Sequence, residues 1–372
     1  MRAFSGSCPI GFPYEASPAE RRTLLTPLTA RALAGAGMRV LAEPGIGAGI
    51  GISDAELAAV GVRFAPADEV WGARLVLRYR SSDPDDVRRL APGQAIAALF
   101  HAEGDPALLA ALTRTRVTAY SFEFLAEHGG RFPLASPGGT IAGIQAVHAG
   151  AAALQHPAGR GVLLGGVPGA QPARVLVIGS GNVGAAAART AAALGARVTV
   201  LTRAAVSAAA YRARAPRGVE VVVNTRPNLL GCLPTADLVI GAILVSTHDT
   251  EPMITEADLA RMRPGAVIVD ATCGYGPGYL PTSGPVQQPG DPPHINRGVL
   301  HVKLDALPAR VPRTASHAYA RAAAPYLVRI ARHALTGRPD PVAESAVIAR
   351  DGALVHPVCR QHADFYRAGV QS

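Results

Sequence analysis

Short runs of apolar residues alternate with stretches of helical spacing along the first third of the chain. Residues 38–42 and 73–77 are short and apolar, which predicts strands. Residues 53–59 and 106–113 have the spacing of short helices, and the first begins with a serine followed by a glutamate three residues later. Strands alternating with helices are typical of an α/β fold.

The same alternation resumes after a cluster of helix breakers at residues 136–139, Ser-Pro-Gly-Gly. An alanine-rich helix is predicted over 140–154, followed by a glycine-rich loop at 159–169. Five short, mostly apolar segments then predict strands: 175–178, 197–202, 219–223, 236–240 and 266–270. Because helical or loop spacers separate them, these strands predict a parallel sheet.

Two later segments depart from this alternation of predicted strands and helices. Residues 274–298 are rich in glycine and proline, and a structureless loop of that length is typical of a functional lid or a disordered segment. Residues 315–336 have a long helical pattern that we expect to be kinked or broken at Pro325.

The most informative motif is the segment Val175-Leu-Val-Ile-Gly179-Ser-Gly181-Asn-Val-Gly184. A predicted strand runs into G-x-G-x-x-G, and an alanine-rich run at 185–194 predicts a helix directly afterwards. This is the dinucleotide-binding fingerprint in its required strand–turn–helix context, although a purely structural glycine turn is the alternative. We expect the cofactor to contact this turn and the end of a later strand, at the following residues: Gly179, Ser180, Gly181, Asn182, Val183, Gly184, Ala242, Ile243 and Leu244.

The second strand of this unit indicates which cofactor is bound. NAD sites usually place a carboxylate there, on the ribose 2′-hydroxyl. This chain has Thr202 and Arg203 instead, with no acidic residue nearby. Arginine binds phosphate bidentately, so the sequence predicts NADP(H) in preference to NAD(H). The alternative is that Arg203 is a solvated loop residue.

Composition excludes several other classes. At 372 residues, with 49% hydrophobic and 17% charged residues, the chain suits two globular domains. The longest apolar runs, such as 236–245, are too short to span a membrane, and no signal peptide is predicted. The four cysteines are scattered, so neither a disulfide framework nor a metal site is expected, and the cytoplasm is the expected location. The net charge of +9 is spread along the chain rather than gathered in a stripe, so no nucleic-acid partner is expected.

Together these patterns predict an α/β chain with two Rossmann-like domains. The nucleotide-binding domain, residues 136–304, is expected to be inserted in a discontinuous substrate domain formed by 1–135 and 305–372. The substrate site is then expected in the cleft between domains, at the carboxyl ends of the strands.

Several segments resemble the alanine dehydrogenase/pyridine nucleotide transhydrogenase superfamily, and the resemblance covers most of the chain. Besides the fingerprint, the segments that carry it are Glu20-Arg-Arg22-Thr-Leu-Leu-Thr-Pro27, Arg160-Gly-Val-Leu-Leu-Gly-Gly-Val-Pro-Gly169, Ala236-Asp-Leu-Val-Ile-Gly-Ala-Ile-Leu244, Arg263-Pro-Gly-Ala-Val-Ile-Val-Asp270 and Val311-Pro-Arg-Thr-Ala-Ser316.

This resemblance implies roles for individual residues. Arg22 matches an arginine that holds the substrate carboxylate, and His101 matches a histidine that faces the carbonyl group. Arg80 stands where alanine dehydrogenases have a lysine, and Gly274 stands where they have a catalytic aspartate. Two expected residues are therefore replaced, which argues against amination by free ammonia.

Two other segments resemble the saccharopine dehydrogenase and N5-(carboxyethyl)ornithine synthase branch, whose members act on secondary amines. They are Tyr120-Ser-Phe-Glu123-Phe-Leu125 and Leu304-Asp305-Ala-Leu-Pro308. Glu123 and Asp305 are therefore candidates to hold a substrate ammonium or to tune His101. Glu123 could equally cap a helix or pair with an arginine, and Asp305 could be a surface residue or a partner of Lys303.

The sequence thus predicts an NADPH-dependent oxidoreductase acting on a C–N bond. The expected reaction reduces an imine formed from an oxoacid and an amino acid, or its reverse. The expected partner is this small-molecule substrate, and the resemblance leaves the presence of a homo-oligomer open. Two alternatives are an alanine-dehydrogenase-like enzyme that uses ammonia and a non-catalytic nucleotide-binding protein.

Overall fold

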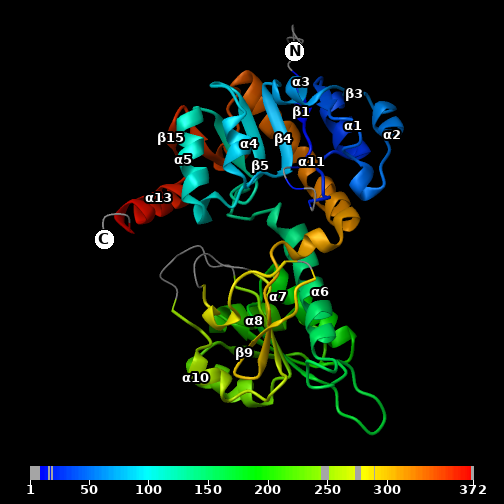
Figure 1. Cartoon of the computed structure of the whole chain (residues 1–372), viewed down its shortest axis with the longest axis vertical. Coiled ribbons are helices and arrows are strands. Elements are labelled where there is room, and N and C mark those ends of the chain that lie inside the picture. The colour runs from blue at the N-terminus through cyan, green and yellow to red at the C-terminus, as the bar shows by residue number, and fades with distance from the viewer. Residues whose placement is uncertain are drawn as a thin grey trace. The chain divides into compact units, whose positions relative to one another are not determined.

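The computed structural model describes residues 9–15, 17, 20–243, 251–272, 278–288 and 290–369 (Figure 1). The chain forms two compact units. Unit 1 comprises Met1–Pro137 and Val311–Ser372, and unit 2 comprises Gly138–Arg310. The assignment of 1–135 with 305–372 to a substrate domain and of 136–304 to a nucleotide-binding domain stays a prediction.

Unit 1 is built on an eight-stranded sheet with the order β15-β14-β6-β5-β4-β1-β2-β3. The six strands from β6 to β3 are parallel, whereas β14 and β15 add an antiparallel edge. The strands are β1 (Pro9–Phe12), β2 (Arg39–Ala42), β3 (Val62–Phe64), β4 (Leu75–Arg80), β5 (Ala95–Leu99), β6 (Thr118–Ser121), β14 (Val347–Arg350) and β15 (Ala353–Leu354).

Helices cover both faces of this sheet. One core contains residues of α1 and α11 packed on β1, β2 and β4, and the core on the other face contains residues of α5 and α13. The helices of unit 1 are α1 (Pro27–Gly35), α2 (Asp54–Ala58), α3 (Ala67–Trp71), α4 (Pro84–Arg88), α5 (Pro106–Thr115), α11 (Pro312–Thr336), α12 (Pro341–Ser345) and α13 (Pro357–Gly369). The predicted strands and helices of this region are therefore present, with ends that shift by a few residues.

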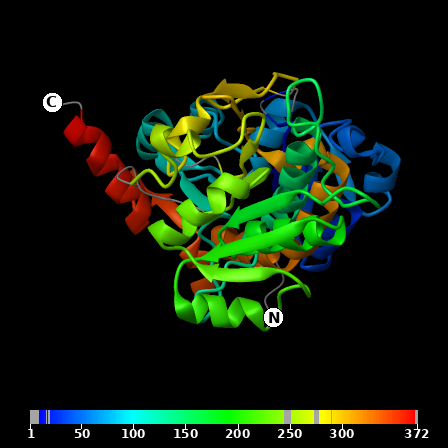
Figure 2. The same cartoon turned by 90° about the horizontal axis from the view of Figure 1, so that it is seen from below.

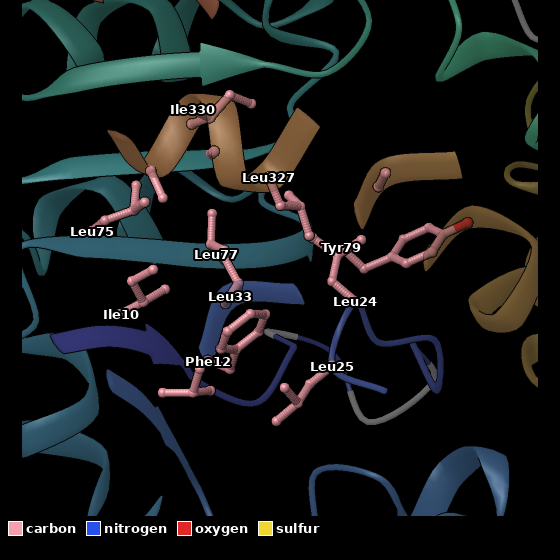
Figure 3. Close-up of a cluster of buried hydrophobic side chains, with 14 of the residues drawn as sticks. Ile10, Phe12, Leu24, Leu25, Leu33, Leu75, Leu77, Tyr79, Leu327 and Ile330 are labelled. Atoms are coloured by element: carbon pink, nitrogen blue, oxygen red, sulfur yellow. The ribbon is translucent and has the colours of Figure 1, made fainter. Parts of the chain in front are cut away.

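The long helix α11 brings the carboxyl-terminal part of the chain back to unit 1. Leu327 and Ile330 of α11 share a buried cluster with Leu75 and Leu77 of β4 (Figure 3). The helix runs through Pro325. The expected break at this proline is therefore wrong, because burial of residues on both sides of it keeps the segment helical.

Unit 2 is built on a seven-stranded sheet with the order β12-β13-β11-β10-β7-β8-β9. The strands from β13 to β9 are parallel, and β12 adds an antiparallel edge. Figure 2 shows strands of this sheet as green arrows. They are β7 (Arg174–Ile178), β8 (Arg197–Thr202), β9 (Glu220–Val223), β10 (Leu238–Gly241), β11 (Val267–Asp270), β12 (His294–Asn296) and β13 (Val299–Val302). The order runs outward from β7 in both directions, as in the doubly wound dinucleotide-binding fold.

Two predictions about unit 2 need correction. The helix expected over 140–154 is α6 (Ala135–Ala153), so Ser136-Pro-Gly-Gly139 forms its first turns instead of a loop. Proline is tolerated in the first turn, because the N–H it lacks would have no partner there. The segment expected to be structureless, 274–298, contains β12, which pairs with β13. The other helices are α7 (Asn182–Ala193), α8 (Ala205–Arg212), α9 (Arg226–Cys232) and α10 (Glu256–Leu259).

Candidate active site

The glycines of the fingerprint in unit 2 each meet a different steric demand. Gly179 has φ +111°, a conformation that L side chains rarely adopt. A Cβ on Gly184 would lie 1.9 Å from the carbonyl oxygen of Gly179, so only glycine lets the helix approach the turn this closely. A Cβ on Gly181 would meet no protein atom within 4 Å, which leaves that side of the turn open.

The helix after this turn begins at Asn182, earlier than the sequence predicts, and Gly181 is its N-cap. No side chain caps this end. The first backbone N–H groups of the twelve-residue helix α7 are therefore available to an anion. Open space at Gly181 together with an uncapped helix N-terminus fits the pyrophosphate of a dinucleotide.

A glycine outside the fingerprint holds α7 in place. A Cβ on Gly143 of α6 would lie 2.2 Å from the carbonyl oxygen of Val183 and 2.9 Å from the Cβ of Ala186. Helices α6 and α7 therefore pack backbone against backbone next to the turn. The sequence offered only a weak signal for this contact, a glycine within an alanine-rich helix.

Thr202 and Arg203, which the sequence predicts to determine the preference for NADP(H), differ in burial at the end of β8. Thr202 is fully buried, and its hydroxyl lies 3.4 Å from the carbonyl oxygen of Val222. Arg203 is exposed and forms no hydrogen bond or ion pair with any described residue. A second arginine, Arg214, donates to the carbonyl oxygen of Ser180 at 3.3 Å, which the sequence did not reveal. The positive charge beside the turn thus comes from two arginines.

The other half of this sheet edge begins after β10. Ala242 is buried and donates its N–H to Ile178 at 2.8 Å, and Ile243 donates its N–H to the hydroxyl of Tyr279 at 3.2 Å. Leu244 and Gly274, both named by the sequence, lie outside the described residues. Asp305 is exposed in the turn after β13.

In unit 1, four predicted or newly found residues follow the carboxyl ends of adjacent parallel strands. Glu15 follows β1, Arg80 ends β4, His101 follows β5 and Glu123 follows β6. Ligands of α/β sheets bind outside this edge, so the residues lie where a substrate is expected. Of the residues proposed as catalytic, Asp305 belongs to unit 2 and the others belong to unit 1.

Arg22 is buried, and Glu20 holds its guanidinium. Its Nε donates to Glu20 Oε1 at 2.7 Å, and its Nη2 forms an ion pair with Glu20 Oε2. The guanidinium also stacks 4.4 Å from the ring centre of Tyr79, the neighbour of Arg80 in the chain. Burial opposes the charge, but the hydrogen bonds that Arg22 donates to Glu20 leave the pKa of Arg22 raised. Arg22 therefore carries a fixed positive charge, with the Nη1 donors not used by Glu20.

Arg80 is half-buried, whereas Arg78 is not available to a ligand. Arg80 donates from Nε to the hydroxyl of Ser82 at 3.0 Å. Arg78, two residues earlier on the same strand, is buried and forms an ion pair with Asp86. Asp86 already neutralises the Arg78 guanidinium below the sheet edge.

Glu15 supports this end of β4 and was not singled out by the sequence. Its carboxylate accepts the backbone N–H groups of Tyr79 at 2.8 Å and Arg80 at 3.1 Å, and it lies 3.7 Å from Arg78. Burial raises the pKa of Glu15 to about 7, although Arg78 and the two N–H groups act in the opposite direction. Glu15 thus fixes the backbone that carries Arg80.

His101 and Glu123 are brought together as a pair. The Nδ1 of His101 lies 3.5 Å from Glu123 Oε1, and the same oxygen accepts the backbone N–H of His101 at 2.8 Å. The hydroxyl of Ser121 donates to the other oxygen of Glu123. His101 has φ 50° and ψ 38°, a left-handed conformation that is uncommon outside glycine and concentrates at functional sites. Glu123 therefore orients a half-exposed imidazole at the sheet edge.

Models of the two domains of a known protein family match most of this chain. The model of the N-terminal domain of the alanine dehydrogenase/PNT family matches residues 11–142, and the model of its C-terminal domain matches residues 146–357. The chain belongs to the alanine dehydrogenase/PNT family.

Individual relatives cover most of the chain. An alanine dehydrogenase from Halomonas elongata is 36% identical over 87% of this chain and 87% of its own length. An alanine dehydrogenase from Mycobacterium tuberculosis is 33% identical over 93% of this chain and 94% of its own length. A solved L-alanine dehydrogenase superposes with a TM-score of 0.87 at 30% identity, covering 96% of this chain and 99% of that one.

These relatives confirm the two-domain α/β fold, the superfamily and the class of nicotinamide nucleotide-dependent dehydrogenase. The prediction that the chain belongs to the saccharopine dehydrogenase and N5-(carboxyethyl)ornithine synthase branch is not supported by these relatives. Within the described part of the chain, no helix is long and apolar enough to cross a membrane, and no group of three or more His, Cys, Asp or Glu residues could hold a metal ion.

Proposed function

We propose that this protein is an amino acid dehydrogenase that interconverts L-alanine, or a similarly small amino acid, with its 2-oxoacid and ammonia. The main support is the similarity to alanine dehydrogenases over nearly the whole chain. Further support comes from unit 1, where Glu20 holds the guanidinium of Arg22 and Glu123 orients the imidazole of His101. A small 2-oxoacid offers one carboxylate and one carbonyl, which these two residue types suit.

The anchor for the substrate carboxylate is a pair of guanidinium groups. Arg22 is permanently charged and held by Glu20, so its remaining donors keep one orientation. Arg80 supplies a second charge from the end of β4, where Glu15 fixes the backbone. Fixing both donors before the substrate arrives lowers the entropy cost of binding.

His101 handles the proton of the reacting group. A histidine is suited to this task near neutral pH, and its ring is oriented here by Glu123. In the deaminating direction, His101 accepts a proton from the amino nitrogen of the substrate. The Cα–H bond then breaks with its electron pair leaving as hydride, and the nitrogen lone pair forms the C=N bond of the imine. Water then adds to the imine carbon, and ammonia leaves to give the oxoacid.

A nicotinamide nucleotide supplies the hydride acceptor in this reaction and becomes reduced. Gly179, Gly181 and Gly184, with Ser180, Asn182 and Val183 between them, form the turn that would hold its pyrophosphate. Ala242 and Ile243 border the adjacent part of the sheet edge, and Leu244 belongs to the same proposed set.

Within this function we propose a preference for NADP(H) over NAD(H). Support comes from the exposed guanidinium of Arg203 at the end of β8 and from Arg214 beside Ser180. The relatives establish only that a nicotinamide nucleotide is used. A 2′-phosphate would pair with Arg203, whereas a free ribose gains no carboxylate partner from Thr202.

A second candidate is the reduction of an imine between an oxoacid and an amino acid. The observation in its favour is Arg80, since a guanidinium stands where alanine dehydrogenases have a lysine and does not release its proton at neutral pH. In that reaction Glu123 or Asp305 would bind the ammonium group of the second substrate.

The two candidates are separated by NADPH and NADH oxidation with pyruvate and other 2-oxoacids. Each oxoacid is assayed with ammonium, with ornithine, lysine or arginine, and without an amine. Turnover with ammonium supports the amino acid dehydrogenase. Turnover that requires an amino acid as the amine replaces it by the second candidate, and nucleotide binding without turnover supports the non-catalytic alternative.

A further inference from the structure

Lys303 is the only lysine of the chain, and it directly follows β13 in unit 2. It is 5% exposed, and its Nζ lies 3.9 Å from Oδ2 of Asp270. Lysine is rarely buried unless it is paired, so this position needs a physical reason.

The two charged residues are neighbours across the sheet. Val269 of β11 pairs with Val302 of β13, so Asp270 and Lys303 each stand one residue further along parallel strands. Side chains alternate between faces of a strand, which places both on the face of Ile268. The pair therefore stands at the carboxyl edge of the sheet.

Neighbouring groups hold both partners. Thr272 donates from its backbone N–H and its hydroxyl to Oδ1 of Asp270, each at 3.2 Å, so that Oδ2 is the oxygen nearest Lys303. The side chain of Gln287 accepts the N–H of Lys303 at 3.0 Å and donates to the carbonyl of His301 at 2.8 Å. Gln287 thus holds the backbone of Lys303, and Asp270 lies beside its ammonium group.

The ammonium group carries three N–H donors. Among the described residues its partner is Asp270, at a distance longer than a hydrogen bond. At this low exposure water reaches the ammonium only in part, and a ligand oxygen at the sheet edge would supply a further acceptor.

The position of the pair in the strand order indicates which ligand this is. The fingerprint turn follows β7, and Arg203 follows β8 on one side of it, where the adenosine ribose is expected. On the other side the order is β10, β11 and β13, so the second half of an extended dinucleotide would cross toward Asp270 and Lys303.

We propose that Lys303 donates a hydrogen bond to the nicotinamide half of the bound dinucleotide, with its carboxamide oxygen as the acceptor. Asp270 is a positioning residue that holds the ammonium at the sheet edge. The inference rests on the nucleotide-binding role proposed above, and it adds a residue that reads the nicotinamide rather than the phosphates or the adenosine.

The test compares the affinity of the full chain for NADPH and for 2′-phospho-ADP-ribose, which has the same phosphates and riboses but no nicotinamide. Lys303→Met should weaken NADPH binding by about tenfold or more, the effect of losing one hydrogen bond to a charged group, and leave the other ligand unaffected. NADH and ADP-ribose form the matching pair if NAD(H) is preferred. Lys303→Arg keeps the charge and should recover part of the loss.

A spectroscopic measurement keeps the proposal testable if Lys303→Met does not fold. Because the chain has one lysine, ¹³C-lysine labelling gives a single side-chain Cε resonance. NADPH should shift this resonance, and 2′-phospho-ADP-ribose should not. The Lys303→Met/Asp270→Asn double variant, which leaves no unpaired carboxylate, provides a further binding measurement.

Three results would overturn the proposal. The first is an equal loss of affinity for NADPH and for 2′-phospho-ADP-ribose in Lys303→Met. The second is a Cε resonance that neither ligand shifts, and the third is a Cε resonance that only the substrate shifts. Since binding is measured without turnover, the outcome is independent of whether L-alanine is the substrate. Absence of any nucleotide binding by the wild-type chain would instead remove the proposed function itself.

Discussion

His301 of β13 allows a quantitative test of how unit 2 is stabilised. Its side chain is fully buried, and neither ring nitrogen has a hydrogen-bond partner among the described residues. Burial, aided by the nearby charge of His294, lowers the pKa of His301 to about 4, whereas Glu256 acts weakly in the opposite direction. The folded chain therefore holds this imidazole in its neutral form.

The direction of the pH dependence follows from these values. An unfolded chain binds a proton on this histidine near pH 6.5, and the folded chain binds it only near pH 4. Between the two values the unfolded state holds more protons, so the free energy of unfolding decreases as the pH falls through this window. The difference between a pKa of 6.5 and a pKa of about 4 lowers the free energy of unfolding by about 3 kcal/mol.

The perturbation is His301→Leu, which removes both buried nitrogens. Urea denaturation of wild type and variant would be followed by far-ultraviolet circular dichroism at several pH values between 4 and 8. The variant should be at least as stable at pH 8, and its advantage should grow by about 3 kcal/mol toward pH 4. His148→Gln, at an exposed position on α6, is the matched control and should keep the wild-type pH dependence. Parallel pH dependences of wild type and His301→Leu would refute the reasoning.

Three further predictions concern the site. Gly184→Ala should weaken NADPH binding by about tenfold or more while Gly231→Ala, at an exposed helix position with no neighbour within 4 Å, does not; equal affinities measured by calorimetry would remove the steric argument. Glu123→Gln should lower kcat by about tenfold or more with a smaller change in KM, because it removes the charge that orients His101, and an unchanged kcat would exclude that role. Arg203→Asp should shift the ratio of kcat/KM values from NADPH toward NADH by about tenfold or more, and an unchanged ratio would exclude Arg203 as the 2′-phosphate ligand.

The sequence predicted the parts of the fold that depend on local pattern. The strand, glycine turn and helix around Gly179 are present because steric demands on each glycine are local, and the capping pattern at Ser53 and Glu56 appears as a capping box at the start of α2. Elements that depend on distant contacts were predicted less well. Pro325 lies within α11, and β12 exists because it pairs with β13.

The candidate site shows the same division. His101 and Arg22 were proposed from recognisable motifs, and their roles stay predictions. Glu15 and Gly143 were not found, since their roles come from contacts with Tyr79 and Val183, far away in the chain. Arg78 and Arg80 stand two residues apart on β4, and the ion pair with Asp86, which occupies Arg78, comes from packing rather than from a local pattern.

The most direct test of the central claim is hydride transfer from L-alanine deuterated at Cα. The protein would be incubated with this substrate and NADP⁺ or NAD⁺, and the reduced nucleotide would be examined by mass spectrometry and NMR. We expect deuterium at C4 of the nicotinamide, together with pyruvate and ammonium in equal amounts. Failure to form reduced nucleotide from alanine and other small amino acids, in a preparation that binds the nucleotide, would contradict the assignment as an amino acid dehydrogenase.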